Sequence, residues 1–264
     1  MKNFNMTRFG RVLKLDFTEG LKPMMWGALC MLLLYLFFFW FAWNIGFHSF
    51  EPKNQIVDPV CESVGAFSMI AMYIYFLITA CTLYRGEQKK QQRIAWLMLP
   101  ASNLEKFTSR WIYMLVFSIV GGLLPFFVAD LVHMGYLGMI GFPVKDATSY
   151  FFNFFPHVRE PYETLSDVIG LYFCYVAIHS FFLLGGVFFK KFHFIVTSAV
   201  FVIGFITISV TANTLGYRNI PTPECIWDDI IAIVFAACLI TLFTWLAYRL
   251  FCRWQVITHK FANV

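Results

Sequence analysis

Six apolar stretches, separated by polar connections, dominate the pattern of this chain. Each is long enough to cross a membrane as a helix, because a helix rises about 1.5 Å per residue and the hydrocarbon core is about 30 Å thick. The predicted spans are residues 24–47, 64–84, 111–133, 168–189, 194–215 and 230–250. The pattern therefore predicts an all-α integral membrane protein, with one membrane domain over residues 24–250 and a tail over residues 251–264.

The basic residues gather in every second connection between the spans. Of the 20 Lys and Arg residues, only four lie in the alternate connections, namely Lys53, Lys145, Arg159 and Arg218. Cytoplasmic connections of membrane proteins retain the excess of Lys and Arg. We therefore predict that both termini, the connection 85–110 and the turn at 190–191 are cytoplasmic.

Composition agrees with a membrane protein. With 59% hydrophobic and 13% charged residues, a soluble domain would expose large apolar patches. The formal net charge of +5 is spread along the predicted cytoplasmic flanks and forms no single basic face. We therefore expect the partner of this surface to be the lipid bilayer, and we do not expect nucleic-acid binding.

Residues 1–23 precede the first span and predict an amphipathic helix that lies along the membrane surface. At 100° per residue one face is apolar and the opposite face is basic. The apolar face holds Phe9, Val12, Leu13, Phe17 and Leu21, and the basic face holds Arg8, Arg11, Lys14 and Lys22. Pro23 is expected to turn this helix into the first span. The helix is either a simple anchor or also a contact for a cytoplasmic protein.

The connection 85–110 contains an apolar run, residues 94–99, that is far too short to span a membrane. A polar stretch that includes Glu87 and Arg93 precedes it, and Pro100 ends it. Ser102 and Glu105 have the spacing of a capping box, which predicts that the third long helix begins here. A short helix with an apolar ridge around Trp96 would need the bilayer surface or a protein groove to cover it.

This connection resembles the segment between spans two and three of type-2 ABC transporter permeases. The shared features are the acidic residue Glu87, the apolar run, Pro100-Ala101-Ser102 and the basic residue Arg110 at the start of the next span. The layout of the whole chain is similar too, with an N-terminal surface helix, six spans and cytoplasmic ends. The Gly-Thr that commonly follows the acidic residue is replaced here by a Gln-rich stretch.

The resemblance implies that the chain is the permease half of an ATP-driven exporter in a bacterial inner membrane. Residues 85–107 would then form a coupling helix that inserts into a separate ATPase subunit. The implied docking residues are Glu87, Arg93, Trp96, Leu97, Leu99 and Pro100. Two permease chains, identical or different, would assemble with two ATPases. ATP and magnesium would bind on the ATPase, so this chain is expected to bind no cofactor and to catalyse no reaction.

Ionisable residues inside the predicted spans are candidates for function, because charge in hydrocarbon is costly. Asp130 and His133 lie one turn apart near the outer end of the third span, and His179 lies near the middle of the fourth. They could line a substrate path or relay protons. They could equally lie at the headgroup level, or form hydrogen bonds to a neighbouring helix.

The seven cysteines show no metal-ligand spacing, so no metal site is predicted. Cys61 and Cys225 are both placed on the outer side by the predicted topology. They could form a disulfide there, or remain two separate thiols.

Two other classes of function stay open. The chain could be an integral-membrane enzyme that uses Asp130, His133 and His179, although no His-Glu-x-x-His or nucleophile-elbow motif supports this. It could also be a membrane partner or immunity protein that does not transport.

Overall fold

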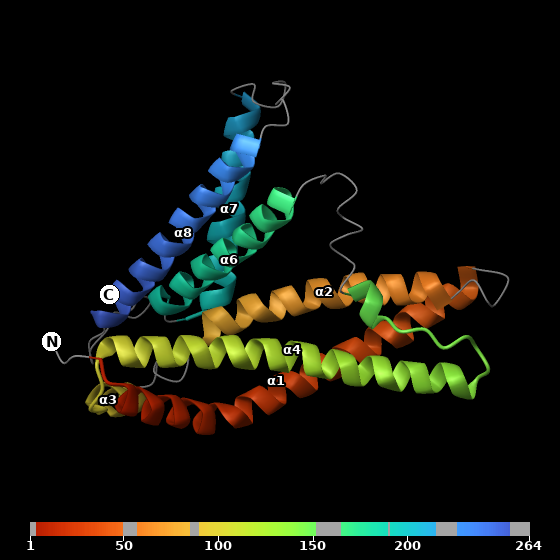
Figure 1. The fold of residues 1–264 in the computed structure, drawn as a ribbon, viewed down its shortest axis with the longest axis horizontal. Coiled ribbons are helices and arrows are strands. Elements are labelled where there is room, and N and C mark those ends of the chain that lie inside the picture. The colour runs from red at the N-terminus through yellow and green to blue at the C-terminus, as the bar shows by residue number, and fades with distance from the viewer. Residues whose placement is uncertain are drawn as a thin grey trace. The chain divides into compact units, whose positions relative to one another are not determined.

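The computed structural model describes residues 4–49, 57–84, 90–151, 165–189, 191–214 and 226–253. These residues form long helices and no strand (Figure 1). The helices are α1 (Met6–Ser49), α2 (Val57–Thr82), α3 (Lys90–Met98), α4 (Asn103–Met139), α6 (Leu165–Phe188), α7 (His193–Thr214) and α8 (Ile226–Cys252). The predicted all-α class is confirmed.

Five of these helices, α1, α2, α4, α7 and α8, are long and apolar enough to cross a membrane. In α6 the described apolar stretch is shorter and covers Tyr172–Phe188. Many large apolar side chains on these helices are exposed, among them Trp26, Ile203 and Phe235, each more than 60%. Apolar surface of this extent is stable in hydrocarbon and unstable in water. The chain therefore has the character of a multi-pass membrane protein.

The chain divides into two compact units, which are described separately. The first, called the N-terminal unit, consists of Leu13–Phe76 and Ile112–Tyr162. Its core lies where α1, α2 and α4 pack together, around Tyr35 and Phe126, whose rings meet edge to face. Tyr75 of α2 reaches between two glycines: a Cβ on Gly27 or Gly121 would lie 3.0 or 2.7 Å from its hydroxyl oxygen. The helices therefore approach closely because these positions carry no side chain.

The second, called the C-terminal unit, consists of Met1–Val12, Leu77–Trp111 and Glu163–Val264. It contains α6, α7 and α8, and α6 packs against both of the others (Figure 1). The end of α2 belongs to the same unit, where the Cys81 thiol donates to the Phe182 carbonyl over 3.2 Å. A Cβ on Gly186 would lie 2.5 Å from the Cys81 carbonyl oxygen, so α6 crosses α2 at backbone contact.

The N-terminal helix continues through Pro23, where a turn between the surface helix and the first span was expected. α1 runs without a break from Met6 to Ser49, with Pro23 inside it. Proline removes one hydrogen bond of the helix, but long apolar helices tolerate it because the flanking turns remain bonded. The surface helix and the first predicted span are therefore one helix, whose ribbon bends along its length (Figure 1).

Other helices also exceed their predicted spans, α2 and α4 by the most. α2 begins at Val57 instead of residue 64, and α4 covers Asn103–Met139 instead of residues 111–133. The 37 residues of α4 correspond to about 55 Å, more than the thickness of a hydrocarbon core. Apolar windows locate only the part of a helix that hydrocarbon can cover, so capped polar ends are missed.

Candidate functional site

The connection that resembles a coupling segment folds into α3, a tight turn and the start of α4. Within the turn, the Leu99 amide donates to the Trp96 carbonyl over 3.3 Å, and the Ala101 amide donates to the Leu99 carbonyl over 2.8 Å. Pro100 has no amide hydrogen to continue the helix, which explains why α3 ends at Met98. The predicted docking residue Glu87 and the side chain of Arg93 lie outside the described residues.

The predicted capping box at the start of α4 is confirmed. The Glu105 amide donates to the Ser102 hydroxyl over 3.2 Å, and the Ser102 amide donates to Glu105 Oε2 over 2.8 Å. Each residue therefore satisfies a backbone amide that the first turn of a helix leaves without a partner.

Glu105 also holds the start of α1. Its Oε1 accepts from the Asn5 amide over 2.6 Å and from Arg8 Nη2 over 3.1 Å. Asn5 in turn caps α1, because its side-chain oxygen accepts from the Thr7 amide over 2.9 Å. Glu105 has no exposed surface. One buried carboxylate therefore joins the first turns of α1 and α4.

A second contact fixes α3 to α4. Lys106 is buried, and its Nζ donates to the Leu97 carbonyl over 3.1 Å, in the last turn of α3. A cation at a helix C-terminus satisfies an open carbonyl and opposes the negative end of the helix dipole. Side-chain hydrogen bonds therefore hold both the end of α3 and the start of α4.

Trp96 was expected to need the bilayer surface or a protein groove to cover it, but another part of this chain covers it. Trp96 is only 5% exposed, and the Arg110 guanidinium carbon lies 4.4 Å from the centre of its ring. The turn at Pro100 folds α3 back, so the start of α4 covers the indole by a cation–π contact. Leu97 and Leu99 are half-buried, Pro100 is exposed, and the most exposed large apolar side chain of α3 is Met98, at 77%.

Aromatic side chains bring two more helix ends to this site. Tyr84, two residues after the end of α2, stacks on Phe107 of α4 with ring centres 6.4 Å apart. Phe251, near the end of α8, contacts both rings at 5.4 and 5.8 Å. We call this assembly the α3 cluster: α3 with Asn5, Arg8, Tyr84, Ser102, Glu105, Lys106, Phe107, Arg110 and Phe251. It joins the two chain-terminal segments to the connection 85–110, all of which the charge pattern places on one side.

The N-terminal helix has the predicted amphipathic pattern in most positions. Phe9, Leu13 and Phe17 are half-buried, Arg11 and Lys14 are exposed, and Leu21 is an exception because it is half exposed. In the N-terminal unit the Phe17 ring lies 5.0 Å from that of Phe117. The amphipathic pattern of this helix did not identify Asp16, which is completely buried.

Asp130 and His133 are engaged in hydrogen bonds within the N-terminal unit. Asp130 accepts from the amides of Ala147 and Thr148 over 2.9 and 3.0 Å, and from the Thr148 hydroxyl over 2.6 Å. It therefore caps the helical turn that begins at residue 148. The Trp43 indole donates to His133 Nε2 over 3.0 Å, which places the proton of a neutral imidazole on Nδ1, 4.0 Å from Asp130.

This arrangement favours the structural alternative for the pair, because both side chains are almost fully buried and hold the segment after α4. His179 is also buried, in α6 of the C-terminal unit. The structure does not bring the three predicted path residues together within one unit.

The start of α2 carries an ion pair that the sequence did not suggest. Lys145 donates to both carboxylate oxygens of Asp58, and the Tyr150 hydroxyl donates to the same carboxylate over 3.2 Å. The hydrogen bond to Asp58 raises the pKa of Lys145. Nearby, Cys61 is a free thiol with no exposed surface. Its predicted disulfide partner Cys225 lies outside the described residues.

No group of three potential metal ligands occurs in the part of the chain that the structure describes. Comparison of the chain with protein-family models, with curated proteins and with solved structures gives no match.

Proposed function

We propose that this chain is the membrane subunit of an ATP-driven exporter, and that α3 docks on a separate ATPase subunit. The proposal starts from the resemblance of residues 85–110 to the coupling segment of type-2 ABC permeases. It includes six spans, with α6 as the fourth, both termini in the cytoplasm of a bacterial cell, and two permease chains in the assembly.

The observation that carries the proposal is the position of Glu105. A coupling element must pass motion from a docked subunit to the spans, which requires rigid links and not a flexible loop. The Glu105 carboxylate links the turn after α3 to the first turns of α1 and α4 over distances of 2.6 to 3.1 Å. A displacement of α3 would therefore move the ends of two long apolar helices together.

The docking surface differs from the one that the sequence alone suggested. Trp96 supports α3 from within, since Arg110 covers its ring. Met98 and Pro100 are exposed, with Leu97 and Leu99 half-buried beside them. A flexible thioether on an exposed helix end fits an apolar protein groove. Glu87 and Arg93 remain docking residues that the resemblance implies.

The enzyme alternative has less support. The candidate catalytic residues Asp130 and His133 already bond to Thr148 and Trp43, in the roles of a cap and an acceptor. A non-transporting membrane partner remains the competing function, because it would share the same helices. It differs in having no need for an ATPase.

The test is recovery of an ATPase with the affinity-purified full-length chain, with Met98→Glu as the variant. A charge at this exposed position would have to be desolvated in a groove, and loss of such an anchor typically costs 2 kcal/mol or more, about 30-fold in affinity. Met139→Glu is the matched control, since Met139 is 88% exposed at the opposite end of α4. We expect the ATPase to be lost with Met98→Glu only.

Two results would contradict the proposal. If the unaltered chain recovers no ATP-hydrolysing protein from its native membrane, the non-transporting function is favoured. If Met98→Glu and Met139→Glu recover the ATPase equally well, docking does not use the exposed end of α3.

A further inference from the structure

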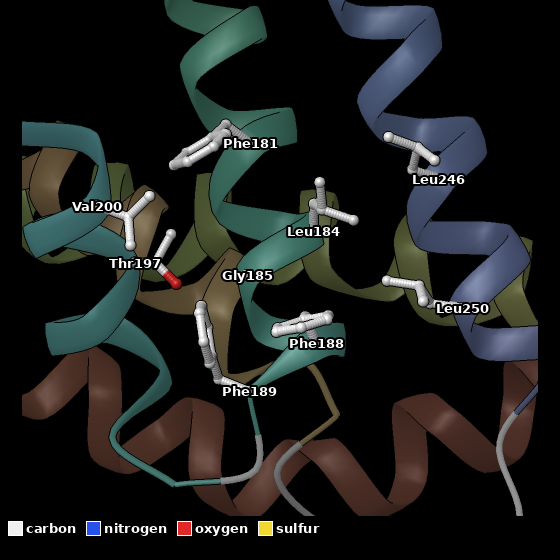
Figure 2. Close-up of a pocket in the computed structure, with 9 residues that line it drawn as sticks. All are labelled: Phe181, Leu184, Gly185, Phe188, Phe189, Thr197, Val200, Leu246 and Leu250. Atoms are coloured by element: carbon white, nitrogen blue, oxygen red, sulfur yellow. The ribbon is translucent and has the colours of Figure 1, made fainter. Parts of the chain in front are cut away.

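A cavity of about 260 Å³ lies between α6, α7 and α8 in the C-terminal unit (Figure 2). Among the described residues, the lining is apolar except for the hydroxyl of Thr197 and includes no charged side chain. The lining residues are Phe181, Leu184, Gly185, Phe188, Phe189, Thr197, Val200, Leu246 and Leu250. A ligand in this cavity would be held by dispersion and by burial of apolar surface. The chemistry of the lining therefore selects an alkyl chain.

The cavity lies at one end of its three helices. Phe188 ends α6, Thr197 is in the second turn of α7, and Leu250 is in the last turn of α8. α7 and α8 are long and apolar enough to span a membrane, so their ends lie near the headgroup level. An alkyl chain in this cavity would accordingly have its polar group beside the helix ends.

Basic residues surround that end. Leu246 and Leu250 line the cavity, and Arg249 and Arg253 share their face of the helix, at three and seven residues from Leu246. Lys191 lies two residues after the lining residue Phe189, in the turn between α6 and α7. All three basic side chains are exposed, and none forms an ion pair with an acidic residue in the described part of the chain.

Arg249 is held in place by an aromatic ring. Its guanidinium carbon lies 4.4 Å from the centre of the Trp245 ring, in the geometry of a cation–π contact. Stacking engages the face of the guanidinium and leaves its N–H donors at the edge, where they match phosphate oxygens. A half-exposed tryptophan beside an arginine is typical of the interface between membrane and water.

We propose that the cavity binds one acyl chain of an anionic phospholipid, whose phosphate lies against Arg249, Arg253 and Lys191. The apolar lining accounts for the chain, and the positive charge, with which no described acidic residue pairs, accounts for the headgroup. The site goes beyond the proposed function, because it needs neither an ATPase nor transport. A neutral lipid would use the cavity but not the arginines.

The test uses the full-length chain in nanodiscs of phosphatidylcholine with a trace of photoactivatable lipid. The probes are phosphatidylglycerol and phosphatidylcholine with the same diazirine-bearing acyl chain, and labelled peptides are identified by mass spectrometry. Each basic residue near a membrane surface changes the affinity for an anionic headgroup about fivefold. We expect phosphatidylglycerol to label the cavity residues of α6 and α8 at least fivefold more than phosphatidylcholine.

Two variants separate the chain site from the headgroup site. Leu246→Trp fills the cavity and should abolish labelling of its lining, whereas Phe235→Trp, at a 63% exposed position of the same helix, should not. Arg249→Gln with Arg253→Gln should weaken the preference for phosphatidylglycerol at least fivefold and leave the phosphatidylcholine signal unchanged. Both arginines are exposed, so these changes leave the core intact.

Equal labelling by the two lipids would overturn the proposal, because the cavity would then hold any acyl chain. Labelling that survives Leu246→Trp but is lost with the arginine variant would also overturn it. In that case the headgroup would bind at the surface without the cavity. Exclusive labelling of α7 residues that face away from the cavity would show ordinary annular lipid.

Discussion

Replacement of Glu105 by glutamine tests the junction on which the proposed coupling depends. Glutamine keeps the size of the side chain but turns one carboxylate oxygen into an amide nitrogen, which cannot accept. In glutamate, Oε1 accepts from Asn5 and Arg8, and Oε2 accepts from Ser102. The variant must therefore break either the capping box of α4 or the link to α1.

The magnitude follows from which bonds are lost. Hydrogen bonds to a charged group contribute about 1.5 to 3 kcal/mol each, and a capping interaction contributes about 1 kcal/mol. The Glu105 side chain has no exposed surface, so water does not replace a lost partner there at full strength. We expect Glu105→Gln to lower the free energy of unfolding by about 2 kcal/mol, less than the sum because one oxygen still accepts.

The assay is thermal unfolding of the purified chain in detergent, combined with hydrogen exchange at the amides of Asn5 and Ser102. Glu19→Gln is the control, because Glu19 is an exposed residue of α1. Glu105→Gln should lower the midpoint and speed exchange at one or both amides, and the control should do neither. An unchanged midpoint with unchanged exchange at both amides would refute the role given to this carboxylate.

Two further predictions concern packing and capping. Gly186→Ala should destabilise the C-terminal unit by about 1–3 kcal/mol, because its Cβ would lie 2.5 Å from the Cys81 carbonyl oxygen. Gly204→Ala is the control and should be near neutral, because the space around Gly204 is open. Equal unfolding midpoints for the two variants would contradict the close crossing of α6 and α2. Asp130→Asn should lower the free energy of unfolding by about 1–3 kcal/mol and speed hydrogen exchange at Thr148. Both carboxylate oxygens of Asp130 accept hydrogen bonds, and the amide nitrogen that replaces one of them in asparagine cannot accept. Unchanged exchange at Thr148 would argue against the cap.

The sequence predicted the parts of the structure that depend on local rules. Apolar length located the long helices, and the spacing of Ser102 and Glu105 located the start of α4, which the reciprocal hydrogen bonds confirm. Pro100 ends α3 as expected, but Pro23 does not end α1. The difference is that α3 has few neighbouring turns, whereas a long apolar helix has hydrogen bonds on both sides of the proline.

Burial depends on contacts between distant residues, and here the sequence was less informative. Trp96 was predicted to need the bilayer or a protein groove to cover it, since nothing in its own segment shows that Arg110 lies over its ring. Asp16 reads as part of a polar helix face, although its neighbours at four-residue spacing, Val12 and Gly20, are buried as well. The four-residue spacing from Val12 and Gly20 was the pattern in the sequence that could have predicted the burial of Asp16. The hydrogen-bond partners of Asp130 are Ala147 and Thr148, which lie in a connection without a recognisable motif, so the sequence did not predict them.

Photocrosslinking from position 98 in the native membrane tests the central claim most directly. A benzophenone amino acid replaces Met98 in one variant and Met139 in the other, since both side chains are exposed and lie at opposite ends of the segment from α3 to α4. The account predicts that position 98 forms an adduct with a polypeptide that binds ATP, and that position 139 does not. Adducts with lipid alone at position 98 would contradict it, because α3 would then rest on the bilayer instead of a partner.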